Sequence, residues 1–274
     1  MAAANAVITR LFDLILLPFR GGAWPAMVWV SLLTSFFMLW VFKHTSNQAA
    51  VRRAKDAVKA HLLEMRLYQD NFRVMLKAEA GVLKANLRYM AANTRPLFVM
   101  IVPLVLILAQ LNLRFACEPL RPGEETIVKL KLKEGVDPSR LRVEAEAGPG
   151  LELTAPAVRI PDEREIDFRL KVLATGDLTV AFIVDGRRVE KTVKSGGGPV
   201  VKVVAKRPGA SFIDRLLYPG ETPLPRSSPV EAVLVDHPAR RLRLFGLGVH
   251  WLVAYFIISV IFGLAFKGVF KVEI

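Results

Sequence analysis

Cysteine and the signatures of enzymes are almost absent from this chain of 274 residues. Cys117 is the single cysteine, so an intramolecular disulfide cannot form, and cysteine pairing gives no information about the compartment. The sequence contains no G-x-x-x-x-G-K-[ST], H-E-x-x-H or G-x-S-x-G motif, and its four histidines are scattered over separate segments. We therefore expect a protein that is not an enzyme and that has neither a cofactor nor a metal site.

Charged residues are missing from three long runs, which are 21–42, 96–113 and 245–266. An apolar run of about 18 residues or more is typical of a membrane-spanning helix. The sequence therefore predicts transmembrane helices over 23–43, 96–114 and 245–267.

The first 22 residues lack the positively charged start of a signal peptide. Asn5, Thr9 and Asp13 fall four residues apart, and apolar side chains occupy most of the remaining helical positions. This pattern predicts an amphipathic helix within 1–22 that lies in the membrane interface.

Positive charge is concentrated between the first two uncharged runs. Lys43 to Arg95 holds 11 Lys and Arg against 4 Asp and Glu, in a chain whose net charge is +13. Because Lys and Arg favour cytoplasmic loops, this segment should lie in the cytoplasm. The charges have two open explanations, a solvated helix exterior or a contact with ribosomal RNA or anionic lipid. The candidate contact residues are Arg52, Arg53, Lys55, Lys59, Arg66, Arg73 and Lys77.

Apolar residues repeat every three or four positions on both sides of the turn Gln69-Asp70-Asn71. Such a repeat predicts two antiparallel helices that pack as a coiled-coil hairpin over 44–95. The first predicted seam is Val51, Ala54, Val58, His61, Met65 and Tyr68, and the second is Leu76, Ala80, Leu83, Leu87 and Met90.

Residues 115–207 alternate apolar and polar side chains in short runs, as half-buried strands do. Asp185-Gly186 is a hairpin turn signal between two of these runs. The pattern predicts an immunoglobulin-like β-sandwich on the extracytoplasmic side. The expected strands are 127–133, 141–147, 158–160, 165–173, 178–184, 187–194 and 200–206. A Pro-rich linker with a short helix and a strand is expected over 208–244.

The fold class expected is therefore membrane α + β, in a multi-pass protein of the cell (inner) membrane. The N-terminus and the sandwich should lie outside, and the hairpin and the C-terminus should lie in the cytoplasm. Arg240, Arg241 and Arg243 precede the third span on its proposed outer side and oppose this orientation, but the hairpin carries far more positive charge.

Polar side chains also occur within the predicted spans. Ser31, Thr34 and Ser35 share one helical face, and Ser259 lies in the third span. Two explanations remain open, namely hydrogen bonds between packed helices and a hydrophilic groove between the spans.

The order of these parts resembles the YidC/Oxa-type membrane insertase superfamily. It is most similar to the three-span branch, which includes archaeal YidC-like proteins and the third subunit of the eukaryotic endoplasmic-reticulum membrane protein complex. The resemblance covers about residues 5–115 and, by position, the third span. It is carried by the interfacial helix Val7–Phe19, the end of the first span Leu32–Phe42, the Tyr68-Gln69-Asp70-Asn71 turn, and Asn93–Pro103, where Arg95 precedes Pro96.

The resemblance implies an insertase or insertion chaperone that moves transmembrane segments of nascent proteins through a cytoplasm-facing groove. The groove-lining candidates are Ser31, Thr34, Ser35, Met38, Arg95, Pro96, Met100 and Ser259. Met38 occupies the place of the groove arginine of bacterial YidC proteins, and the long β-domain replaces a short loop of the three-span relatives. The implied partners are nascent membrane proteins, the ribosome, anionic lipid and an extracytoplasmic protein that binds the sandwich.

The alternative function is a non-transporting scaffold whose three spans anchor a β-sandwich that binds a partner protein. An ion channel is disfavoured, because no span carries a ring of charge or a Gly-rich filter.

Overall fold

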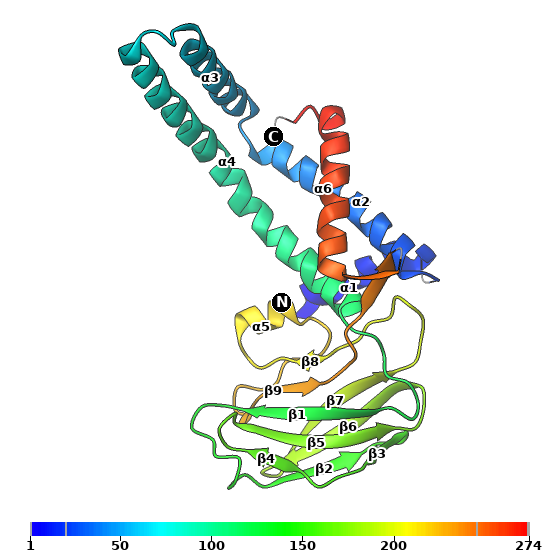
Figure 1. Ribbon diagram of the computed structural model, residues 1–274. Helices are drawn as coiled ribbons and strands as arrows, with labels where there is room; N and C mark the ends of the chain where they lie inside the picture. The colour runs from blue at the N-terminus through cyan, green and yellow to red at the C-terminus, as the bar shows by residue number, and fades with distance from the viewer. Residues whose placement is uncertain (1, 20, 245, 273–274) are drawn as a thin grey trace. The chain divides into compact units, whose positions relative to one another are not determined.

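The computed structural model describes residues 2–19, 21–244 and 246–272. The chain divides into two compact units, Met1–Val28 with Leu106–Ala254 and Trp29–Val105 with Tyr255–Ile274. The long helices α2 (Ala23–Thr45), α4 (Phe72–Phe115) and α6 (Trp251–Phe270) each contribute residues to both units (Figure 1).

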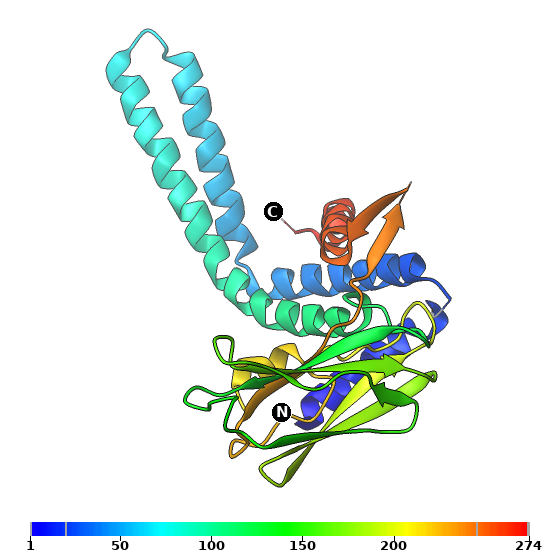
Figure 2. The same ribbon diagram turned by 60° about the horizontal axis from the view of Figure 1, so that its bottom comes forward.

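The first unit contains a β domain of two antiparallel sheets (Figures 1 and 2). In the described residues, the larger sheet has the order β3-β5-β1-β9-β8, with β4 also paired to β5, and the smaller sheet has the order β2-β6-β7. The strands are β1 (Glu125–Leu132), β2 (Val143–Ala147), β3 (Leu151–Leu153), β4 (Val158–Ile160), β5 (Glu165–Val172), β6 (Gly176–Val184), β7 (Arg187–Ser195), β8 (Lys206–Arg207) and β9 (Val230–Val235).

One apolar core lies between the two sheets, and alternation along each strand supplies it. In β1, for example, Val128 and Leu130 are buried while Lys129 lies nearer the solvent. The rings of Phe168 in the larger sheet and Phe182 in the smaller sheet are 5.0 Å apart. The predicted hairpin turn at residues 185–186 is confirmed, because both residues have positive φ and Val184 pairs with Arg187.

The last part of the β domain differs from the sequence prediction. Residues 201–205 form no strand, although the Ala205 carbonyl accepts a hydrogen bond from the Val235 N–H, and only Lys206 and Arg207 form the short edge strand β8. The strand expected within the linker is confirmed as β9, and it lies between β1 and β8. The sheet therefore extends beyond the expected boundary at residue 207, because alternation reveals a strand but not which distant strand it joins.

Short elements surround the β domain in the first unit. They are α1 (Ala2–Leu16), the 3-10 turn η1 (Leu17–Phe19), α5 (Phe212–Leu217), β10 (Arg241–Leu244) and β11 (Leu247–His250). The pairing of β10 with β11 explains why α6 begins at Trp251, later than the expected residue 245. The run is uncharged from residue 245, but its first part, with two glycines, forms a hairpin rather than a helix.

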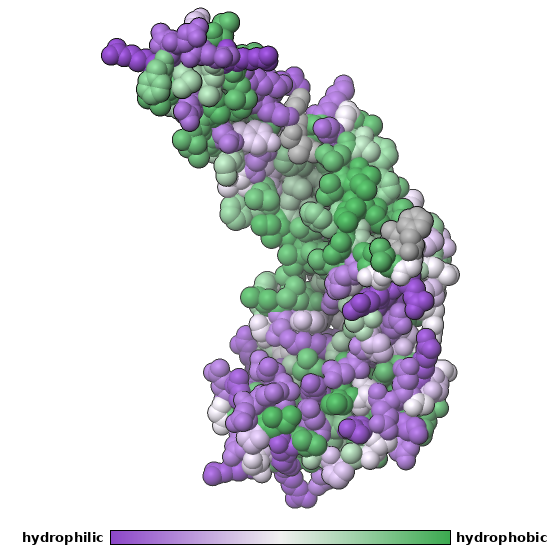
Figure 3. All heavy atoms as spheres, in the orientation of Figure 1, coloured by the Kyte–Doolittle hydropathy of each residue, from purple (hydrophilic) through white to green (hydrophobic). Residues whose placement is uncertain are grey.

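Three helices in the described chain are long and apolar enough to cross a membrane, namely α2, α4 and α6. Their most apolar windows have mean hydropathies of 1.8, 2.3 and 2.2, and at most 44% of each window is buried inside the protein. Such exposed apolar surface suits lipid and not water. The protein therefore combines membrane-type helices with a β-rich region, and Figure 3 shows apolar residues on the surface of the helices and hydrophilic ones over the β domain.

The second unit contains a helical hairpin. Helix α3 (Gln48–Leu67) is capped at its N-terminus by Asn47, whose side chain accepts a hydrogen bond from the Ala50 N–H. It runs beside the first half of α4 in both ribbon views, and the turn between them covers the expected residues (Figures 1 and 2). Helix α4 continues through Pro96 and Pro103, so the proline at 96 does not end it.

Candidate functional site

The polar face of α2 lies against α6 and is closed to solvent. Ser31, Thr34 and Ser35 are all buried. Ser35 Oγ donates to the carbonyls of Ser31 at 2.7 Å and Ser259 at 2.9 Å, and Tyr255 Oη donates to Thr34 Oγ1 at 3.3 Å. Thr34 and Ser35 thus make the hydrogen bonds between helices that the first of the two explanations requires, while the buried hydroxyls of Ser31 and Ser259 have no partner among the described residues.

Aromatic side chains extend the same helix contact. The ring of Phe36 lies 4.7 Å from that of Phe266 and 5.6 Å from that of Phe270. Hydrogen bonds and ring contacts along this face of α2 together hold it against residues 255–270 of α6, which belong to the second unit. The four polar candidates, three on α2 and Ser259 on α6, therefore lie within a helix–helix contact.

The remaining groove candidates have different surroundings. Met38 on α2 and Met100 on α4 are half-buried, Pro96 is buried, and Arg95 is exposed. Thioether side chains adapt to irregular apolar partners, so the two methionines keep a surface suited to apolar ligands.

Small residues on α4 make the hairpin contact. Ala78 and Ala85 are buried, and Gly81 lies so close to α3 that a Cβ there would come within 2.7 Å of the His61 ring. His61 thus lies in the contact as expected, and its Nδ1 is 3.1 Å from Glu64 Oε2. Alanine and glycine allow two helix backbones to approach closely, so this face determines how α3 docks.

The second predicted seam does not face α3. Its residues are exposed along the whole of the hairpin and are Leu76, Ala80, Leu83, Leu87 and Met90. The prediction that this row packs inside the hairpin is therefore wrong. Hydrophobicity favoured the leucine row, but the closer approach offered by the small-residue row decides the packing.

The basic candidates lie on the hairpin surface. Arg52, Arg53, Lys59, Arg66, Arg73 and Lys77 are exposed, and Lys55 is half-buried. Arg73 and Lys77 lie on the first turns of α4, next to the exposed leucine row. Figure 3 accordingly shows hydrophilic and apolar residues side by side near the tip of the hairpin.

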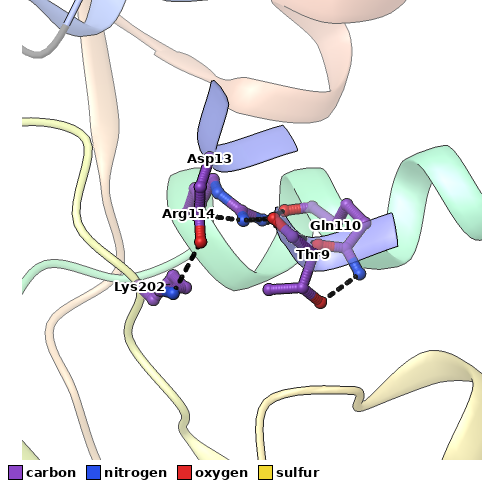
Figure 4. A network of polar contacts seen from close by, with 5 residues as sticks. All are labelled: Thr9, Asp13, Gln110, Arg114 and Lys202. Carbon is purple, nitrogen blue, oxygen red and sulfur yellow. Dashed lines mark hydrogen bonds and ion pairs between the residues drawn. The ribbon is translucent and has the colours of Figure 1, made fainter. Parts of the chain in front are cut away.

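A buried ion pair that the sequence analysis did not identify joins α1 to the end of α4 (Figure 4). Arg114 is 2% exposed, and its guanidinium donates to Asp13 Oδ1 at 2.7 Å, to the Thr9 carbonyl at 3.1 Å and to Gln110 Oε1 at 2.8 Å. Lys202 Nζ donates to the second oxygen of Asp13 at 2.9 Å. Each carboxylate oxygen thus has its own cation.

This network orients α1 with its polar side toward the protein. Val7, Leu11 and Leu14 on its other side are exposed, which suits a helix whose apolar face contacts lipid. The sequence contains part of the signal for this network. Thr9 and Asp13 are four residues apart, as are Gln110 and Arg114, so each pair lies on one face of its helix. Burial alone would raise the pKa of Asp13, but hydrogen bonds from Lys202 and Arg114 and their charges hold it below its usual value.

The β domain has a second buried cation and a half-buried imidazole. Lys191 is 1% exposed and donates to Glu221 Oε2 at 3.0 Å, while Glu221 Oε1 accepts from the Thr192 N–H at 2.9 Å. Burial lowers the pKa of His237 to about 4, so this histidine is neutral at physiological pH. Burial also raises the pKa of the Cys117 thiol, which makes it a poor nucleophile.

A pocket of about 350 Å³ lies between the end of α4 and the β domain in the first unit, with Leu113, Cys117, Tyr218 and His237 among its lining residues. No group of three or more His, Cys, Asp or Glu in the described part of the chain could hold a metal ion.

Comparison with protein families, with curated proteins and with solved structures finds no match for this chain.

Proposed function

We propose that this protein is a YidC-like insertase or insertion chaperone for membrane proteins. The observation that carries the proposal is the hairpin, a basic pair of helices whose exposed leucine row belongs to the same helix as an apolar membrane-type segment. Such a surface offers an apolar contact outside the bilayer and a direct continuation into it. It suits a protein that receives apolar segments before they enter lipid.

Two finer features of the fold are part of this proposal. We interpret the hairpin as a short antiparallel coiled coil, although its contact uses small residues on the α4 side. We interpret the β domain as an immunoglobulin-like sandwich, because two antiparallel sheets enclose one apolar core.

The proposed orientation places the hairpin in the cytoplasm and the β domain outside. The argument is the net charge of +7 over residues 43–95, where 11 Lys and Arg stand against 4 Asp and Glu. Among the cations that precede the third span and oppose this orientation, one counts for less in the charge argument than its sequence position indicates. Arg240 is 5% exposed and donates to the carbonyls of Cys117 and Pro199, so it serves the β domain's backbone.

We place the client path away from the α2–α6 contact. Ser31, Thr34, Ser35 and Ser259 are engaged there, whereas Met38, Arg95 and Met100 retain accessible surface. We therefore assign the path to the cytoplasmic part of α4 and to Met38. Nascent membrane proteins are its clients, and the exposed cations meet ribosomal RNA or anionic lipid.

The alternative function is a membrane scaffold whose β domain binds a protein outside. The observation that favours it is the Asp13–Arg114–Lys202 network, which ties the β domain to two other elements of the first unit. A domain held in this way can present a fixed surface to a partner.

Depletion of the protein from its native cell, followed by insertion assays for small membrane proteins, tests the proposal. We expect insertion to decrease and to recover with the wild-type chain. A photo-crosslinker at Met38 should capture nascent chains, whereas one at Ser35 should not, because Ser35 is buried. Normal insertion of every client, together with capture of a folded protein by a crosslinker at Glu163 in the β domain, would support the scaffold instead.

A further inference from the structure

The exposed row on α4 is longer than the hairpin prediction required. Its spacing of four and three residues continues without interruption past the hairpin into the apolar segment. Every position of the row is exposed, and the positions are Leu76, Ala80, Leu83, Leu87, Met90, Thr94, Leu97 and Ile101. We call this row the α4 seam.

The spacing of the α4 seam specifies the shape of its occupant. A strict repeat of seven residues matches the knobs and holes of a second helix, whereas a lipid surface requires no such register. From Leu76 to Ile101 the seam is about 37 Å long, close to the length of a membrane-spanning helix of about 20 residues. The seam lies on α4, which contains a segment apolar enough to cross a membrane.

The charges beside the seam argue against a second copy of this chain. Arg73, Lys77, Lys84 and Arg88 follow one edge of it, and residues 43–95 carry a net charge of +7. Two such hairpins placed face to face would repel each other. Nucleic acid would satisfy the cations but would leave the leucines in water.

We propose that the α4 seam binds a single apolar α-helix, the transmembrane segment of a client, before that segment enters the bilayer. The inference rests on the proposed insertase function and adds the place where the client first binds. Because the row continues from Leu76 to Ile101, a bound helix can slide along it while one of its apolar faces stays covered.

The test uses the full-length protein in nanodiscs and a labelled, synthetic apolar helix of about 20 residues. A photo-crosslinker at Leu83 or Leu87 should capture this peptide, and one at Arg88, which is exposed beside the seam, should not. The double variant Leu83→Ser with Leu87→Ser should weaken peptide binding by at least about tenfold. The control variant Leu63→Ser with Leu67→Ser, equally exposed on α3, should bind normally.

Client insertion with the same variants separates this inference from the proposed function. Insertion that requires the protein but proceeds normally without the two seam leucines, with no peptide captured at Leu83, would overturn the inference and leave the insertase function standing. Peptide capture by the seam without any effect of the protein on insertion would remove the proposed function instead. Capture of a second copy at Leu83, or loss of binding to anionic vesicles as the sole effect of the variant, would also overturn the inference.

Discussion

At the scale of single residues, the buried charges matter most. Arg114 is the clearest case, because a guanidinium that is 2% exposed must be neutralised where it lies. Asp13 and the carbonyl of Thr9, both on α1, satisfy it. The N-terminal helix therefore depends on a residue that lies a hundred positions away in the chain.

Asp13→Asn should destabilise the first unit by about 2 kcal/mol, because Asp13 is partly exposed but its loss leaves the buried charge of Arg114 uncompensated. Thermal unfolding of the full chain in detergent measures the change. Asp137→Asn removes an exposed pair with Arg140 and should cost less than about 1 kcal/mol. Equal effects of the two substitutions would contradict a structural role for Arg114.

His237 should make the β domain sensitive to acid. Its pKa is about 4 when folded and about 6.5 when unfolded, so the unfolded state binds a proton first as the pH falls. The stability is therefore complete above about pH 6.5 and decreases toward pH 4, by up to about 3 kcal/mol. Hydrogen exchange of the β9 amides in the full chain follows this loss.

The variant His237→Gln provides the control and should lose most of the dependence between pH 6.5 and 4. Burial raises the pKa of Asp167, which acts in the opposite direction near pH 4 and persists in the variant. An unchanged profile in His237→Gln would show that another group causes the acid sensitivity.

At the scale of elements, the hairpin shows how two packing faces compete on one helix. Apolar periodicity in α4 correctly predicted a helix and selected the wrong contact face. The row chosen by hydrophobicity is exposed, while Ala78, Gly81 and Ala85 face α3. Side-chain volume decides such a choice, and a count of apolar residues does not include it.

Gly81→Ala should destabilise the hairpin by about 1 kcal/mol, although alanine is the better helix former, because the new Cβ would overlap the His61 ring. In a His61→Ala background the same substitution should stabilise the hairpin by about 1 kcal/mol. Circular dichroism during denaturation of the full chain gives both values. A stabilising effect in both backgrounds would show that α3 does not approach α4 at Gly81.

The β domain shows a different limit of sequence analysis. Six of the seven expected strands were confirmed, because alternation and the Asp185-Gly186 turn are local signals. The neighbour of β9 could not be predicted, since Val235 pairs with Val128 from the far end of the domain. The prediction of the candidate groove was limited in the same way, because Ser35 bonds to a carbonyl on α6, a helix far away in the sequence.

At the scale of the whole molecule, three apolar helices in the described chain indicate a membrane-spanning protein. Residues 43–95, from the end of α2 into α4, carry a net charge of +7 out of +13 for the whole chain, and the segment 115–244 is nearly balanced, with 22 Lys and Arg against 19 Asp and Glu. This asymmetry is the physical basis for the proposed orientation.

Cysteine labelling tests the orientation in a Cys117→Ser background. We expect Glu163→Cys in the β domain to react with an impermeant maleimide in intact cells. Asn71→Cys at the hairpin turn should react only after the membrane is permeabilised. Both positions are exposed, so a difference between them reports the compartment and not burial. Equal labelling in intact cells would overturn the orientation.

The position of β9 has a consequence for biosynthesis. Its hydrogen bonds to β1 connect the last strand of the larger sheet with the first, and α6 follows soon after it in the chain. A ribosome must therefore translate nearly the entire β domain before the sheet can close. Until then β1 has an unpaired edge, and a chaperone that shields this edge during synthesis would prevent aggregation.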